Sequence, residues 1–278
     1  IQQLETEVGL QLLVKSGRKV SLSQAGEEML RQCRRILNQV LLTEEAMDAF
    51  HPAEGGRGGL LHLGVVSSAH YFAPALLMAF AERWPGVKFK LTVDRRERIL
   101  AMLQDHQLDV AIAGYPPSEA DVEAETFAQN PHCIVASANH PLAKKRRVHW
   151  DALRNEPFIF REPGSATRHF FEHLIQAQSL QVRLSMELSG NETIKQAVIA
   201  GMGISFLSAH VCQTEIKSGL MAVLDMVDMP KYIDWCFIHR RDSVLSGVHL
   251  AFKQFVVNEG ARYSECVLAP MSQSFVAN

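Results

Sequence analysis

The chain has 278 residues, a formal net charge of −2 and 47% hydrophobic residues, so it is long enough and apolar enough to bury the cores of more than one domain. Its five cysteines lie far apart with no C-x-x-C pair, which excludes a secreted disulfide framework and favours reduced thiols in a cytoplasm. No charged-then-apolar leader opens the chain, and the longest uncharged apolar run, residues 197–209, is too short for a membrane span. We therefore expect a cytoplasmic protein with no membrane association.

The first predicted element is the tail of a helix at residues 1–8, followed by a short hairpin with Arg18 and Lys19 at its tip. The chain has no initiator Met and no N-cap ahead of Ile1, so we expect it to begin inside an element. A helix followed by a hairpin with a positive tip commonly places the helix in a DNA groove and the cations on phosphates. The same residues also fit an ordinary helix with a solvated turn, and their spacing leaves both interpretations open.

A long helix is predicted from Ser23, which is a suitable N-cap, with Glu27 and Glu28 near the positive end of the helix dipole. Apolar residues recur along it at spacings of three and four and form one stripe. We expect this stripe to pair with the same helix of a second subunit, the alternative being the body of its own chain. The stripe consists of Met29, Leu30, Cys33, Ile36, Leu37, Val40, Leu41 and Met47.

The glycine-rich residues 52–59 are predicted to form a flexible tether, because they offer almost no side chain to bury. Beyond the tether, short apolar runs alternate with amphipathic ones, which predicts a parallel sheet covered by helices. The expected strands are residues 60–66, 87–93 and 108–114, and the expected helices are residues 71–83 and 96–104.

The same alternation repeats in a second unit. Its expected strands are residues 133–136, 182–188 and 204–207, and its expected helices are residues 165–178 and 191–200. A strand at 235–238 and a helix at 244–257 return to the first unit. We therefore predict an α/β fold with lobe I at about residues 60–129 and 236–262 and lobe II at about residues 130–235. Two chain crossings between the lobes predict a hinged cleft.

The sequence lacks the residue spacings that common enzyme classes need. There is no G-x-S-x-G elbow, no H-E-x-x-H pair among the twelve histidines, and no P-loop. Residues 201–206 match a dinucleotide fingerprint only until Phe206, and they lead into a strand rather than a helix. We therefore expect no catalytic residue, no metal ligand and no cofactor.

Polar residues at helix starts are the remaining candidates for a binding site. Hydroxyl groups and free backbone N–H groups at the positive end of a helix bind carboxylate or phosphate, although most such residues are simply N-caps. Three starts converge on the predicted cleft, and they carry Ser67 and Ser68, Ser165 and Thr167, and Asn191.

Arginines near the same positions would supply full positive charge to a phosphate, since a guanidinium can bind it with two parallel hydrogen bonds. Arg95 and Arg96 precede a helix in lobe I, and Arg168 lies in the first turn of a helix in lobe II. Each of the three also fits a solvated surface position. Together with the helix starts, they predict an anion site between the lobes.

Residues 9–26 read G-L-Q-L-L-V-K-S-G-R-K-V-S-L-S-Q-A-G and resemble the wing and the start of the linker helix in LysR-type transcriptional regulators. Members of that family usually carry Leu-Phe-Glu-Arg at residues 12–15 and Thr at residue 23. This chain keeps the apolar anchor, the cation and the N-cap hydroxyl but has Val14 in the third position. The resemblance continues in residues 64–66, 74–77, 84–87, 108–112, 140–142 and 198–204.

Within the family, three segments look most like the regulators of carbon dioxide fixation operons, the RuBisCO regulators. These segments are residues 71–74, 96–97 and 161–168. The resemblance to this group implies an effector that is a phosphorylated sugar or a nucleotide metabolite.

The family resemblance implies a DNA-binding transcription factor rather than an enzyme. It implies that residues 1–22 are a partial winged helix-turn-helix, consisting of the end of the recognition helix and the wing, and that residues 23–51 are a dimerising linker helix. After the tether, residues 60–270 would form a two-lobe effector-binding domain of periplasmic-binding-protein type. The implied assembly is a homodimer or homotetramer that binds double-stranded promoter DNA.

The resemblance also carries residue roles to this chain. A small anionic metabolite between the lobes would modulate promoter binding. The alternative is a solute-binding protein or an enzyme on the same two-lobe fold. The implied DNA contacts are Gln3, Lys15, Arg18 and Lys19, and the implied effector contacts are Ser67, Ser68, Arg95, Arg96, Glu162, Ser165, Thr167, Arg168 and Asn191.

Overall fold

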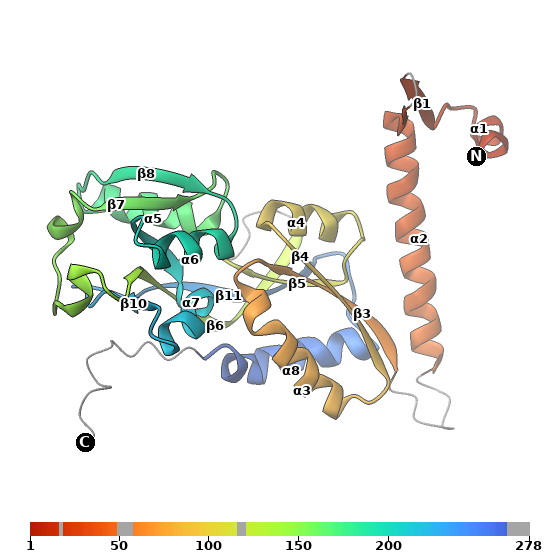
Figure 1. The fold of residues 1–278 in the computed structure, drawn as a ribbon. Helices are drawn as coiled ribbons and strands as arrows, with labels where there is room; N and C mark the ends of the chain where they lie inside the picture. Colours follow the sequence, from red (N-terminus) through yellow and green to blue (C-terminus); the bar gives the residue numbers. More distant parts are fainter. Residues whose placement is uncertain (17–18, 49–57, 116–120, 266–278) are drawn as a thin grey trace.

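The computed structural model describes residues 1–16, 19–48, 58–115 and 121–265 (Figure 1). The chain starts with helix α1 (Gln2–Val8), the hairpin strands β1 (Leu13–Ser16) and β2 (Lys19–Leu22), and the long helix α2 (Gln24–Asp48). This order agrees with the helix, hairpin and long helix expected from the sequence. The predicted DNA contact Arg18 and most of the predicted tether lie outside the described residues.

Hydrogen bonds tie α1, the hairpin and α2 together. The Glu5 carboxylate accepts backbone N–H bonds from Leu13 (3.0 Å) and Leu12 (2.7 Å), and these two bonds lower the pKa of Glu5. The Ser23 hydroxyl accepts the Gly26 N–H at 3.0 Å, which confirms Ser23 as the N-cap of α2. A Cβ at Gly26 would lie 2.0 Å from the Leu12 carbonyl oxygen, so α2 can begin against the hairpin only because this residue is glycine.

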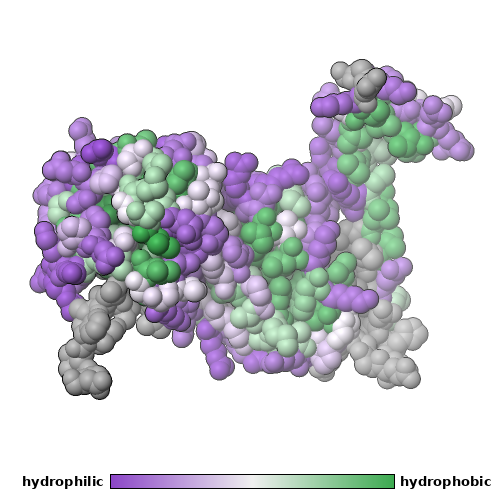
Figure 2. Space-filling view, in the orientation of Figure 1, coloured by the Kyte–Doolittle hydropathy of each residue, from purple (hydrophilic) through white to green (hydrophobic). Residues whose placement is uncertain are grey.

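Most of the apolar stripe of α2 is exposed in the single chain, among the side chains that the structure describes. Figure 2 shows hydrophobic residues along this helix, and Ile36, Leu37 and Met47 are exposed. Charged groups contact lobe I instead, with the Arg31 guanidinium 3.7 Å from the Asp105 carboxylate. The body of the chain therefore leaves these apolar side chains open, and their pairing with a second subunit stays a prediction.

One sheet runs through both lobes in the order β4-β3-β5-β11-β6-β9-β7-β8, with β10 paired to β6. Lobe I contains β3 (Gly59–Val66), the 3₁₀ turn η1 (Ala69–Tyr71), α3 (Ala73–Arg83), β4 (Val87–Asp94), α4 (Arg96–Gln104), β5 (Val110–Gly114) and α8 (Gly247–Tyr263). Lobe II contains η2 (Pro141–Lys144), η3 (Trp150–Leu153), β7 (Pro157–Arg161), α5 (Ala166–Ala177), β8 (Arg183–Leu188), α6 (Asn191–Ile199), β9 (Ile204–Ser208), α7 (Ala209–Lys217) and β10 (Met221–Val223).

Two long antiparallel strands, β6 (Val122–Ser137) and β11 (Lys231–Arg240), join the lobes (Figure 1). Strand β11 pairs with β5 through residues 235–238 in lobe I, and β6 pairs with β9 through residues 132–135 in lobe II. These strands are the two crossings expected from the sequence. Their middle residues consequently lie between the lobes.

The expectation of a parallel sheet is correct only within each lobe. Strand β3 is parallel to β4 and β5, and β7 is parallel to β8 and β9, whereas β6 and β11 are antiparallel to their neighbours. The predicted strand at 133–136 is only the end of β6, and β7 and α7 were not predicted. Residues 123–126 of β6 are exposed and Pro131 interrupts the run, so this segment lacks the pattern of a buried strand. It becomes a strand because β11 supplies its hydrogen-bonding partner.

Each lobe has its own packed core. In lobe I the rings of Phe80 and Phe252 lie 5.1 Å apart, and in lobe II those of Phe171 and Phe206 lie 5.0 Å apart. No helix in the described part of the chain is both long enough and apolar enough to cross a bilayer. Among the same residues, no three His, Cys, Asp or Glu side chains are grouped so that they could hold a metal ion.

Candidate functional site

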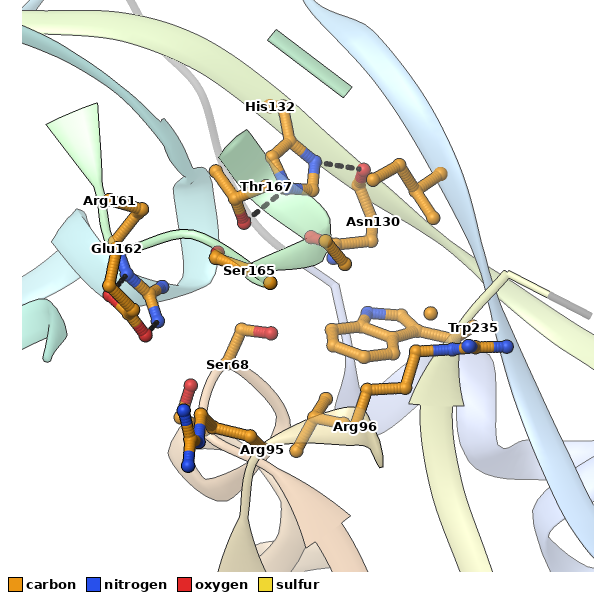
Figure 3. Close-up of a pocket in the computed structure, with 16 residues that line it drawn as sticks. Ser68, Arg95, Arg96, Asn130, His132, Arg161, Glu162, Ser165, Thr167 and Trp235 are labelled. Carbon is orange, nitrogen blue, oxygen red and sulfur yellow. Dashed lines mark hydrogen bonds and ion pairs between the residues drawn. The ribbon is translucent and has the colours of Figure 1, made fainter. Parts of the chain in front are cut away.

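A cleft lies between the two lobes at the carboxyl ends of β3, β4, β5 and β7, the edge at which α/β sheets bind ligands (Figure 3). Its empty volume is about 510 Å³, including the part that opens to solvent. Lobe I supplies the residues that follow β3 and β4, lobe II supplies the end of β7 and the start of α5, and β6 and β11 supply the floor. The polar and aromatic lining residues are Ser67, Ser68, Arg95, Arg96, Asn130, His132, Arg161, Glu162, Ser165, Thr167 and Trp235.

Most of the predicted effector contacts meet in this cleft. Asn191 lies directly behind the lining, where its Oδ1 accepts from Arg161 Nη1 at 2.6 Å and its Nδ2 donates to the Ser67 carbonyl at 3.3 Å. Asn191 therefore braces lobe II against lobe I instead of lining the cleft. Seven of the nine predicted contacts do line it: Ser67, Ser68, Arg95, Arg96, Glu162, Ser165 and Thr167.

Arg168 is the predicted contact that the structure places outside the cleft. Its guanidinium binds the carboxylates of Glu172 and Glu187 and the Arg161 carbonyl oxygen, and it lines a neighbouring hollow instead. Successive side chains of a helix point about 100° apart around its axis, so Thr167 reaches the cleft and the next residue does not. In this structure the Arg168 side chain therefore does not line the cleft, and its contact with a ligand stays a prediction.

The start of α5 brings the N-terminus of a helix to the cleft. Ser165 is the N-cap, yet its buried side chain makes no capping hydrogen bond. The backbone N–H groups of residues 166–168 precede the first turn's internal bonds and have no partner within the helix. An anion held by these groups and by the Ser165 hydroxyl would sit at the positive end of the helix dipole. Figure 3 shows Ser68 of lobe I on the opposite side of this space.

His132 determines what Thr167 can offer to a ligand. His132 Nδ1 lies 3.1 Å from the Asn130 carbonyl oxygen, which can only accept, so Nδ1 carries the proton. Burial lowers the pKa of His132 to about 3, so the ring is neutral at pH 7 and Nε2 is an acceptor. The Thr167 hydroxyl, 3.4 Å from Nε2, donates to it. Thr167 therefore offers an incoming anion its backbone N–H, while its hydroxyl proton is used within lobe II.

The cleft carries positive charge. Three arginines, Arg95, Arg96 and Arg161, and one carboxylate, Glu162, line it, which sums to a formal charge of +2. Arg161 is 7% exposed and binds both carboxylate oxygens of Glu162, at 2.9 and 2.8 Å. Burial opposes ionisation of Glu162, but this pairing holds its pKa below the usual value. Arg95 is exposed and forms no ion pair with another described residue, so its charge is open to a ligand.

Sequence reasoning missed the floor of the cleft and one buried cation. Asn130, His132, Ile233 and Trp235 come from β6 and β11, and they reach the cleft only because these strands cross between the lobes. The sequence carries no local signal for them. Arg161 stands at the start of the segment 161–168 that supports the family resemblance, so that segment is the signal that could have identified it.

Polar contacts join the lobes at one edge of the cleft. The Tyr71 hydroxyl of lobe I donates to Glu192 Oε1 of lobe II at 2.6 Å, and burial together with this bond raises the pKa of Tyr71. Lys195 binds Glu192 at 2.8 Å and lies 5.2 Å from the centre of the Tyr71 ring. Relative motion of the lobes would have to break or reshape these contacts.

The chain is similar to known transcriptional regulators along most of its length. The model of the LysR substrate binding domain matches residues 54–261. The HTH-type transcriptional regulator CbbR of Rhodospirillum rubrum is 43% identical over 256 residues, which cover 92% of this chain and 84% of that protein. The RuBisCO operon transcriptional regulator of Allochromatium vinosum is 35% identical over 262 residues, 94% of this chain and 86% of that protein.

A solved structure supports the same relationship. The regulatory domain of CcmR from Synechocystis PCC6803, in complex with 2-PG, superposes with a TM-score of 0.68 and is 35% identical. The match covers 72% of this chain and 96% of that domain.

Proposed function

This chain belongs to the LysR family of transcriptional regulators, and from that membership we propose that it controls carbon dioxide fixation genes in response to a small phosphorylated acid bound between its lobes. The observation that carries the proposal is the start of α5. Its first N–H groups, which have no partner within the helix, and the Ser165 hydroxyl stand in a cleft of charge +2, opposite Ser68 of the other lobe. The similar CcmR domain, whose complex contains 2-PG, supports this class of ligand.

A ligand in this cleft would contact both lobes at once. It would favour the lobe arrangement in which its contacts with lobe I and lobe II form together, at the expense of other arrangements. Promoter binding would change if that arrangement alters how subunits present their DNA-binding parts. The uncovered stripe of α2 supports assembly into a homodimer or homotetramer.

The relatives are named as transcriptional regulators, and we propose that this chain likewise binds its ligand without converting it, in a cytoplasm. Titration calorimetry of the whole chain with 2-phosphoglycolate tests the effector site. We expect saturable binding at one site per chain, weaker binding of inorganic phosphate, and unchanged ligand after prolonged incubation. Absence of binding would contradict the proposed effector, and turnover would favour the enzyme alternative.

Arg95, which lines the cleft, and Arg168, which lines the neighbouring hollow, give a matched test of the site. Arg95→Ala should weaken 2-phosphoglycolate binding about tenfold, because it removes an uncompensated cation from the lining. Arg168→Ala should change the affinity by less than about twofold, because two carboxylates already neutralise that side chain. Calorimetry on both variants checks the pair, and the reverse order of effects would place the ligand in the neighbouring hollow.

For the N-terminal hairpin we propose phosphate contacts without base recognition, and Gln3 on α1 is exposed beside it. In the hairpin Lys15 pairs with Val20 and Ser16 with Lys19, so Lys15 and Lys19 lie on opposite faces. Lys19→Ala should weaken binding to promoter and random DNA alike and reduce the slope of log K against log salt by about one.

Fluorescence anisotropy with a fragment upstream of the carbon dioxide fixation genes and with a random duplex would measure this effect. Lys217→Ala, at the exposed end of α7, is the control that keeps net charge equal. A loss confined to the promoter fragment would show instead that Lys19 contributes to base recognition.

A further inference from the structure

Trp235 carries a buried hydrogen-bond donor without a partner. The side chain is 0% exposed and lines the floor of the cleft, yet its Nε1 has no hydrogen-bond partner among the described residues. Buried N–H groups of this kind are rarely left unpaired, since their lost hydration is not replaced. An unpaired indole N–H at a ligand cleft points to an acceptor that arrives with the ligand.

The position of the Trp235 ring is fixed on several sides. The pairing of β11 with β6 shifts register between Trp235 and Cys236, where Phe127 is the extra residue on β6. The rings of Phe72 and His210 pack against the indole at 5.3 and 5.9 Å. Figure 3 shows the nitrogen-bearing edge of the ring directed into the cleft, on the side of Asn130 and Ser165. The donor therefore cannot turn away to find another partner.

A comparison with Trp150, whose indole N–H is also unpaired among the described residues, shows why the position of Trp235 matters. Trp150 is 3% exposed and its Nε1 also has no partner among the described residues. Trp150 belongs to the core of lobe II, however, and does not line the cleft. An unpaired indole alone is thus no sign of a site, and the inference for Trp235 depends on its place in the cleft floor.

We propose that Trp235 is a specificity-determining residue whose indole N–H donates to a carboxylate oxygen of the effector, while the start of α5 holds the phosphate. An indole nitrogen can donate but cannot accept, so its partner is an acceptor such as a carboxylate or carbonyl oxygen. The two features come from different elements, β11 and α5, on different sides of one cleft. They select a short ligand with an anionic group at each end over a simple phosphate ester. This inference rests on the proposed effector site.

Trp235→Phe removes the donor and keeps an aromatic ring. In calorimetry on the whole chain, this substitution should weaken the binding of 2-phosphoglycolate about tenfold, as expected for the loss of one hydrogen bond to a charged acceptor. It should leave the affinity for ethyl phosphate, which lacks the carboxylate, unchanged. Trp150→Phe is the matched control, because it makes the same change in the other buried unpaired indole, and it should leave both affinities unchanged.

The outcomes separate this inference from the proposed function. If wild-type protein binds 2-phosphoglycolate and Trp235→Phe binds it equally well, or loses both ligands to the same extent, the carboxylate role of Trp235 is overturned while the effector site stands. If wild type binds neither ligand, the proposed effector and this inference both fail. Should Trp235→Phe not fold, fluorescence of a protein with both Trp84→Phe and Trp150→Phe, in which Trp235 is the remaining indole, replaces it. The emission should change with 2-phosphoglycolate and not with ethyl phosphate, and equal responses would overturn the inference.

Discussion

Ser165→Asp is expected to abolish effector binding while leaving the ligand-free protein at least as stable as wild type. The new carboxylate would accept the unpaired N–H groups at the start of α5 and occupy the position proposed for the phosphate. Repulsion between the Asp carboxylate and the phosphate should weaken the binding of 2-phosphoglycolate at least about a hundredfold. Asp is a favourable N-cap residue at the positive end of a helix dipole, worth about 0.5–1 kcal/mol, so the melting temperature should hold or rise.

Ser246→Asp supplies the control for this substitution. Ser246 is the N-cap of α8, its side chain makes no capping hydrogen bond either, and it does not line the cleft. Calorimetry and thermal unfolding of both variants should show the same small change in stability and a loss of affinity only for Ser165→Asp. Wild-type affinity in Ser165→Asp would remove the start of α5 from the proposed site.

Acid is expected to destabilise the protein through His132. Burial lowers the pKa of His132 to about 3 in the folded chain, whereas an unfolded histidine titrates near about 6.5. Between these values the unfolded chain binds a proton that the folded chain excludes, so the free energy of unfolding rises with pH. The contribution is fully present above about pH 6.5 and is lost as the pH falls toward 3. At about pH 4.5 the loss amounts to roughly 3 kcal/mol.

His132→Gln isolates the contribution of His132 to the pH dependence of stability, because glutamine can still bond to Asn130 and Thr167 but does not titrate. Urea unfolding between pH 7 and 4.5 should give a slope against pH that is smaller than that of wild type by up to about 1.4 kcal/mol per pH unit. Parallel curves for wild type and His132→Gln would mean that His132 is protonated in the folded chain.

The hydrogen-bond donors of the cleft have fixed places within their elements, whereas the two lobes that carry them can change their relative position. Ser165 and the start of α5 belong to lobe II, Arg95 and Ser68 belong to lobe I, and Trp235 lies on a strand shared by both. A ligand that needs all three can be bound fully only in one relative position of the lobes. The proposed effector response therefore depends on the same contacts that select the ligand.

The sequence predicted correctly those helices and strands that depend on residues close together in the chain. Helix α4 was predicted with its observed bounds, and the N-cap of α2 was predicted at Ser23, because periodicity and capping depend on residues within one turn. The apolar runs of β3 and β9 were recognised as strands for the same reason. The polar first half of β6 was missed because its strand conformation depends on β11, about a hundred residues away in the sequence.

The binding residues divide in the same way. The sequence by itself determined the family, the helix starts and the arginines beside them, since each is a short motif next to the end of an element. Only the tertiary structure decided that Arg168 pairs with Glu187, that the Thr167 hydroxyl bonds to His132, and that the Trp235 Nε1 has no partner among the described residues. Whether a polar group is free depends on which distant residues pack against it, and no pattern of near neighbours records that.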